Sequence, residues 1–217
     1  MPAAPVVDVS SLAVRRPGAL VLRQVELRVD AGEAIGLFGD NGSGKTTLLR
    51  VLATLIRPSE GGGTVLGARL GTAEIEAIRP RIGLIGHEPA LYPNLTLGEN
   101  LALVHDLCAA PAATPAEALA AVGLAAAGRR RVAHCSNGMR RRAEFARMLI
   151  TRPDLLLLDE AHVGLDPAAA SLVAHLVADV RERGGAAVVV SHERDRVVGI
   201  VGRTVVLGDG RLEEGGR

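Results

Sequence analysis

The sequence predicts an α/β protein in which a mostly parallel sheet is covered by helices. Short apolar runs that are typical of buried strands alternate with runs of helical spacing near 167–183 and 193–199. The apolar runs are residues 34–38, 82–85, 155–158, 186–190 and 204–207. At 217 residues the chain is long enough to bury a full core, so we expect a single domain over residues 1–217.

Two parts of the chain depart from this alternation. Residues 6–14 and 25–29 alternate apolar and polar side chains, which predicts an N-terminal antiparallel β subdomain. From residue 87 the pattern changes to Ala- and Leu-rich helical runs broken by prolines. We therefore expect an inserted helical subdomain at 87–149, with residues 1–86 and 150–217 forming the remaining α/β core and its β subdomain.

A glycine-rich segment follows the first buried strand. It reads Gly39-Asp-Asn-Gly-Ser-Gly-Lys-Thr46, which is the spacing G-x-x-x-x-G-K-[ST] of a phosphate-binding loop. Glycines permit positive φ and let main-chain N–H groups approach an anion, and the positive end of the following helix points at it. A turn that matches by chance is the alternative, but the strand, loop and helix occur in the required order. The expected phosphate-binding residues are Gly39, Asp40, Asn41, Gly42, Ser43, Gly44, Lys45, Thr46 and Thr47.

Lys45 is the only lysine of the chain, since every other fixed side-chain cation is an arginine. A compact ammonium acts as a point charge among phosphate oxygens, which favours a direct phosphate contact for Lys45. The hydroxyl of Thr46 is expected to bind Mg²⁺.

The run of four leucines at 155–158 ends in Asp159 and Glu160. Ligands of open α/β sheets collect at the carboxyl ends of the strands, where these acids stand. We expect Asp159 to hold Mg²⁺ and Glu160 to orient or deprotonate the water that attacks a terminal phosphate. Two acids after a strand also occur on solvated edges, so this interpretation depends on the phosphate loop.

Composition excludes several classes of function. The net charge is +1 and the aromatic residues are only Phe38, Tyr92 and Phe145, so we do not expect nucleic-acid binding. Cys108 and Cys135 are isolated, which favours a reducing compartment over a disulfide scaffold. Without an apolar run of membrane-spanning length or a signal peptide at its start, the chain is expected to be soluble and cytoplasmic.

A third motif, Cys135-Ser-Asn-Gly-Met139, precedes an arginine-rich run and the acidic strand. It resembles the signature Leu-Ser-Gly-Gly-Gln of ATP-binding-cassette proteins, with Ser136 and Gly138 kept and Asn137 replacing a glycine. Physically, Ser136 caps a helix N-terminus, which attracts anions. The alternative is an ordinary helix cap followed by an arginine-rich solvated face.

Further matches extend the resemblance to ATP-binding-cassette ATPases from about Val6 to Glu213. Gly164-Leu165-Asp166 stands where the family has its dimer-contacting loop, and His192 stands where it has its switch histidine. The resemblance implies a RecA-like P-loop NTPase fold that binds ATP and Mg²⁺. It also implies a homodimer in the ATP-bound state, in which Ser136, Asn137, Gly138 and Asp166 contact the partner's nucleotide, and His192 senses the γ-phosphate.

The partners that the resemblance implies are integral membrane permease subunits, which would hold the chain on the inner face of the cell membrane. His87 stands where the family usually has a catalytic glutamine. The pair Gly86-His87 is similar to the ATP-binding subunit of the cytochrome c biogenesis haem exporter, and a generic drug or lipid exporter is the alternative. The usual adenine-stacking aromatic is missing, and Arg15 or Arg16 could stack on the base instead.

Three classes of function are compatible with these motifs. The first is an ATP-hydrolysing motor subunit that drives a membrane transporter. The second is a cassette protein that remodels ribosomes or DNA, but such proteins usually carry two cassettes or a long coiled-coil insertion. The third is a scaffold that binds ATP and hardly hydrolyses it, which the presence of Glu160 and His192 disfavours.

Overall fold

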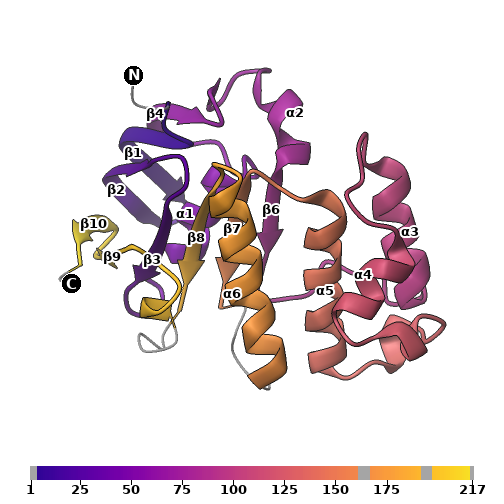
Figure 1. Ribbon diagram of the computed structural model, residues 1–217. Helices are drawn as coiled ribbons and strands as arrows, with labels where there is room; N and C mark the ends of the chain where they lie inside the picture. Colours follow the sequence, from indigo (N-terminus) through magenta and orange to yellow (C-terminus); the bar gives the residue numbers. More distant parts are fainter. Residues whose placement is uncertain (1–3, 161–166, 192–196, 216–217) are drawn as a thin grey trace.

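The computed structural model describes residues 4–160, 167–191 and 197–215, which form two sheets and several helices (Figure 1). The smaller sheet is antiparallel and has the strand order β2-β1-β4-β5. Strand β2 ends in a period-two pattern in which Val25, Leu27 and Val29 are buried and the residues between them are exposed. The strands are β1 (Val7–Arg16), β2 (Ala19–Val29), β4 (Glu60–Val65) and β5 (Ala68–Arg69).

The larger sheet has six strands in the order β10-β9-β3-β8-β7-β6. Its strands pair in parallel except for β10, which pairs with β9 in antiparallel orientation. Every residue of β3, β7 and β8 is buried, as expected for central parallel strands covered on both faces. The strands are β3 (Ala34–Phe38), β6 (Ile82–Ile85), β7 (Leu155–Asp159), β8 (Ala186–Val190), β9 (Arg203–Gly208) and β10 (Arg211–Glu214).

Helices α1 and α6 pack against the larger sheet, and α3, α4 and α5 gather beyond β6 on the side away from β1 and β2 (Figure 1). Helices α3 and α4 begin with capping boxes made by Thr96 with Glu99 and by Thr114 with Glu117. The hydrogen bond from the main-chain N–H of Thr96 lowers the pKa of Glu99. The helices are α1 (Lys45–Leu52), α2 (Ile75–Ile78), α3 (Leu97–Leu107), α4 (Pro115–Ala121), α5 (Asn137–Thr151) and α6 (Pro167–Glu182).

The core has two parts, one on each face of the larger sheet. Strand β7 shows the division, because Leu155 and Leu157 pack with the antiparallel sheet and α1. The alternate residues Leu156 and Leu158 pack with residues of α3, α4, α5 and α6. The division follows from strand geometry, in which successive side chains point to opposite faces. The carboxyl end of β7 is thus held between two packed layers.

Most strand predictions from the sequence are confirmed, and β6 and β8 have the expected bounds. The sequence did not predict β10 or the short β5. Both are edge strands with few buried residues, so their sequences lack a clear apolar pattern. The helices α3 to α5 lie between residues 97 and 151, while the division at 87 and 149 stays a prediction.

Candidate functional site

The glycine-rich loop lies between the end of β3 at Phe38 and the start of α1 at Lys45. Gly39, Gly42 and Gly44 all have positive φ, of 145°, 81° and 110°. At Gly39 a Cβ would collide with the main-chain carbonyl oxygen of Leu207. Because both the backbone angle and the crowding exclude a side chain, this position requires glycine. The loop thus has the conformation that a cradle of main-chain N–H groups needs.

Lys45 is buried, with 6% of its surface exposed. Its Nζ donates hydrogen bonds to the carbonyl oxygens of Gly39 at 2.7 Å and Asp40 at 2.8 Å. An ammonium has three N–H donors, so it can make one more hydrogen bond. The partners of the Lys45 ammonium in the loop are therefore neutral carbonyl groups rather than a carboxylate, so its positive charge can still attract a phosphate.

Thr46 and Asp159 lie together although they come from different parts of the chain. The Oγ1 of Thr46 donates a hydrogen bond of 2.7 Å to the Oδ2 of Asp159, which is buried at the end of β7. A hydroxyl and one carboxylate are the protein ligands that Mg²⁺ usually takes beside phosphates, because this ion keeps several waters. Within residues 4–160, 167–191 and 197–215, no group of three or more His, Cys, Asp or Glu residues that could hold a metal comes together. The donor set thus fits Mg²⁺ bound together with a phosphate ligand.

Glu160 follows directly and has a φ of 52°, which is unusual for a residue other than glycine. Its N–H donates to the carbonyl of Val190 at 3.1 Å, so the turn away from β7 is held by β8. The half-buried Glu160 side chain helps to line a pocket of about 200 Å³. The lining residues are Val21, Asn41, Gly42, Gly44, Lys45, Thr46, Thr47, Asp159 and Glu160.

The other predicted loop residues lie around this pocket. Asp40 and Ser43, with Asn41 and Gly42, line a second hollow of about 630 Å³ between the loop, β2 and the β9–β10 turn. The Oγ of Ser43 is buried and has no hydrogen-bond partner among the described residues. An unpaired buried hydroxyl is costly, so a bound acceptor such as a phosphate oxygen would satisfy it. This observation supports the fit of a phosphate group to the loop.

Ser136 is the N-cap of α5, as the sequence predicts, and its Oγ accepts a hydrogen bond from the N–H of Met139 at 3.2 Å. Ser136 and Asn137 are exposed, and a Cβ at Gly138 would meet no atom within 4 Å. None of the three lines the pocket around Lys45. The N-terminus of α5 is thus an open surface, separate from the phosphate loop of the same chain.

Three further predicted residues are not brought to the pocket. His87 is exposed and is not among the residues that line it. Asp166 and His192 lie outside the described residues. Their expected roles stay predictions.

Two residues near the site were not predicted. Val21 lines the pocket, and the apolar sequence around it in β2 does not indicate that this residue contacts the site. Arg141 of α5 is partly buried, and its guanidinium bonds the main chain of residues 86 and 87. The alternative of a solvated arginine face is therefore wrong for this residue, and also for Arg147, whose side chain is only 18% exposed. The high arginine content of the motif is the only sequence feature that could have indicated these contacts.

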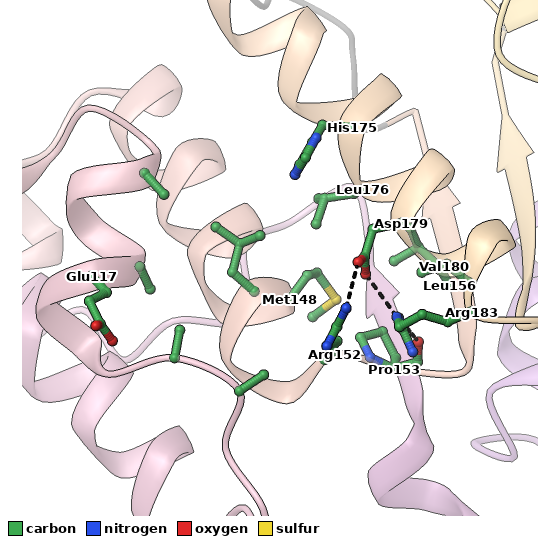
Figure 2. A pocket seen from close by; sticks show the side chains of 15 residues that line it. Glu117, Met148, Arg152, Pro153, Leu156, His175, Leu176, Asp179, Val180 and Arg183 are labelled. Carbon is green, nitrogen blue, oxygen red and sulfur yellow. Dashed lines mark hydrogen bonds and ion pairs between the residues drawn. The ribbon is translucent and has the colours of Figure 1, made fainter.

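Another hollow, of about 300 Å³, lies between α4, the end of α5 and α6 (Figure 2). Its walls are mostly alanine, leucine and methionine side chains, and Asp179 at its rim pairs with Arg152 at 3.0 Å and with Arg183 at 3.0 Å. Burial by itself would raise the pKa of Asp179, but the hydrogen bonds and charges of the two arginines outweigh it and lower that pKa. The pair with Arg152 connects α6 to the segment after α5.

In the described part of the chain, no helix is both long and apolar enough to cross a membrane.

The sequence matches known proteins over most of its length. The profile of the family described as "ABC transporter" matches residues 22–163. The methionine import ATP-binding protein MetN of Caulobacter vibrioides is 39% identical over 207 residues, which are 92% of this chain and 62% of that protein. MetN of Cupriavidus necator is 35% identical over 97% of this chain and 65% of its own length. The chain thus spans a little over three fifths of these relatives.

Solved structures show the same fold. An ATP-binding subunit of an ABC transporter superposes with a TM-score of 0.86 at 26% identity, covering 97% of this chain and 89% of that one. A dimeric ATP-binding cassette in a post-hydrolysis state, bound to ADP and Pi, superposes with a TM-score of 0.84 at 25% identity, covering 96% and 98%. The predicted P-loop NTPase fold with an antiparallel β subdomain is confirmed.

Proposed function

Because this chain belongs to the ABC transporter family, we propose that it is the subunit that binds and hydrolyses ATP to power such a transporter. The observation that carries the proposal is the convergence of Lys45, the Thr46–Asp159 pair and Glu160 on one pocket. A phosphate-binding cation, a metal-binding pair and a candidate base are the parts that phosphoryl transfer to water requires. Here they come from α1 and from the end of β7.

Each residue has a separate task in this proposal. The loop N–H groups and Lys45 bind the β- and γ-phosphates of ATP, and Lys45 uses the N–H that its two carbonyl partners leave free. Thr46 and Asp159 would hold Mg²⁺, which neutralises charge on the phosphates when it is bound. Glu160 orients the attacking water and accepts its proton. The held turn at Glu160 keeps this carboxylate beside the phosphate site.

The complete site requires a second copy of the chain. The N-terminus of α5 with Ser136, Asn137 and Gly138 is an exposed anion site that does not line its own chain's pocket. We propose that it faces the γ-phosphate held by a partner copy, so ATP joins two chains head to tail. A cassette that superposes on this chain is dimeric, which supports the pairing of two chains.

The adenine base is expected to lie near the β1–β2 turn. Arg15 and Arg16 are both exposed there, and either could place its planar guanidinium under the base. The pair of Arg15 with Glu60 at 3.0 Å uses the edge of the guanidinium and leaves its face free.

The direction and the cargo are proposed from the relatives. The expectation of haem export rested on the pair Gly86-His87, and the relatives reported above do not support it, since they are methionine importers. We propose import, with methionine as the first cargo to test. Integral membrane permease subunits would be the partners and would hold the chain at the inner face of the membrane.

The purified chain, measured with and without Mg²⁺, tests the enzymatic part of this proposal. We expect steady release of phosphate from ATP that requires Mg²⁺. If the chain binds ATP but does not hydrolyse it, even with permease subunits present, the result would instead indicate the third class of function, a scaffold that binds ATP. For the transport part, we expect recovery from native membranes with a polytopic partner; recovery only with ribosomes or DNA would contradict it.

A further inference from the structure

Strand β6 lies at one edge of the larger sheet, and α5 runs beside that edge (Figure 1). Alternate carbonyl groups of a strand point to opposite sides, so those of Leu84 and Gly86 point the same way. Both accept hydrogen bonds from arginines of α5. The side chains of α5 thus take the place of a neighbouring strand at this edge.

The arginine nearer to the N-terminus of α5 makes the more extensive contact. Arg141 donates from Nη1 to the carbonyl of Gly86 at 2.6 Å and from Nη2 to the carbonyl of His87 at 3.2 Å. Arg147 donates from Nη2 to the carbonyl of Leu84 at 2.8 Å, within the strand itself. Because a guanidinium is planar and rigid, two bonds from Arg141 fix the direction of the chain as it leaves β6.

Glu144 lies between these arginines on the same face of α5, three residues from each. It is fully buried, and its Oε2 accepts a hydrogen bond from Arg147 at 3.2 Å. Its Oε1 has no hydrogen-bond partner among the described residues. A buried carboxylate is costly unless cations accompany it, so Glu144 favours the inward positions of both guanidinium groups.

Arg141 is also close to the carboxylate that would hold Mg²⁺. Ile85, the last residue of β6, pairs with Leu158 of β7, so Gly86 leaves β6 beside Asp159, the last residue of β7. Burial lowers the pKa of Arg141, and the charges of Glu144 and Asp159 oppose this effect. One guanidinium therefore bonds the main chain that carries His87, beside the end of β7 where Asp159 stands.

We propose that Arg141 is a positioning residue for ATP hydrolysis, which fixes residues 86 and 87 beside Asp159 and couples their position to that of α5. Helix α5 begins at the surface that Ser136 caps, so a displacement of that surface by the partner's nucleotide moves residues 86 and 87 as well. The inference rests on the proposed ATPase function and adds a residue to it.

The test compares Arg141→Gln with Arg152→Gln, a variant that removes a guanidinium after the other end of α5, where it pairs with Asp179. For R141Q we expect kcat to fall at least about tenfold while KM for ATP changes less than about twofold. R152Q should keep the wild-type kcat. Amide hydrogen exchange at residues 86–88 should become faster in R141Q only. Equal kcat in R141Q and the wild type, or unchanged exchange, would overturn the proposal.

A double-mutant cycle with His87→Ala separates positioning from general stability. If Arg141 acts through the segment of His87, H87A reduces kcat less in the R141Q background than in the wild type. Independent, multiplying effects would contradict the coupling. If R141Q does not fold, Arg141→Lys keeps a cation but loses the planar fork, and the same cycle and exchange measurement apply. A wild-type chain without ATPase activity, also in the presence of permease subunits, would refute the proposed function, whereas the exchange experiment would still test the contact of Arg141 with residues 86 and 87.

Discussion

The hydroxyl of Thr46 and the carboxylate of Asp159 are joined by a hydrogen bond of 2.7 Å, although 113 positions separate them in the sequence. This bond brings the first turn of α1 to the carboxyl end of β7. It unites the phosphate loop and the acidic strand in one pocket, and it places the two expected Mg²⁺ ligands within reach of one ion.

Changing Asp159 to Asn should therefore weaken the binding of Mg²⁺ more than the binding of ATP. The amide keeps an acceptor for Thr46 but loses the negative charge, so the Mg²⁺ concentration for half-maximal ATPase activity should rise about tenfold or more. Titration of activity with Mg²⁺ at saturating ATP measures this. Thr46→Ser, which retains the hydroxyl, is the control and should stay near the wild type; an unchanged Mg²⁺ requirement in D159N would contradict the assignment.

Replacing Lys45 by Ala removes the cation of the phosphate loop. We expect ATP affinity to fall about 10- to 100-fold, the loss typical of a charge-assisted hydrogen bond. Arg50→Ala is the matched control, because Arg50 is an exposed cation on the same helix. Calorimetric titration with ATP measures both variants, and equal affinities would show that the loop does not bind the phosphates.

Replacing Glu160 by Gln should separate binding from hydrolysis. The amide cannot accept a proton from water, so the turnover rate should fall about 100-fold or more while ATP affinity is kept. With hydrolysis blocked, ATP and Mg²⁺ should hold the chain as a dimer, which light scattering detects. Glu182→Gln changes an exposed acid at the end of α6 and should behave like the wild type. An E160Q chain that stays monomeric at saturating ATP would rule out the head-to-tail arrangement.

Ser136 and Thr114 are both N-caps, and their alanine variants offer a comparison of structure with function. Each change removes one capping hydroxyl and should cost about 1 kcal/mol of stability. Only S136A should also weaken ATP-dependent dimerisation of the E160Q chain, because the N-terminus of α5 is the proposed anion site. Similar dimerisation of the two variants would mean that Ser136 has only a capping role.

Asp179 gives a prediction about pH. Its pKa is lower in the folded chain than its ordinary value of 3.8, because the bonds from Arg152 and Arg183 outweigh the effect of burial. The carboxylate therefore stabilises the fold above the unfolded-state pKa, and this contribution is lost as the pH falls through the folded-state pKa. Asp179→Asn should lower the melting temperature by about 2 °C at neutral pH. The difference should shrink below about pH 4, and a difference that grows on acidification would contradict the sign.

Features that depend on neighbours along the chain can be predicted from the sequence alone. The glycine spacing before Lys45 predicts the loop, because only glycine accepts those backbone angles. The four leucines before Asp159 predict a strand buried on both faces, and Ser136 predicts the start of α5. Each of these signals is a local matter of backbone conformation or periodicity.

The motifs predict that Thr46 and Asp159 share one magnesium site, and in the fold their side chains are hydrogen-bonded to each other. Other contacts are visible only in the fold, because no periodicity indicates that Arg141 leaves the solvent to bond the carbonyls of Gly86 and His87. The burial of Glu144 between two arginines is equally invisible in the sequence, where the run of charges resembles a solvated helix face. The physical reason is that such contacts depend on which helix covers the open edge of β6, and this is set by the packing of the whole sheet.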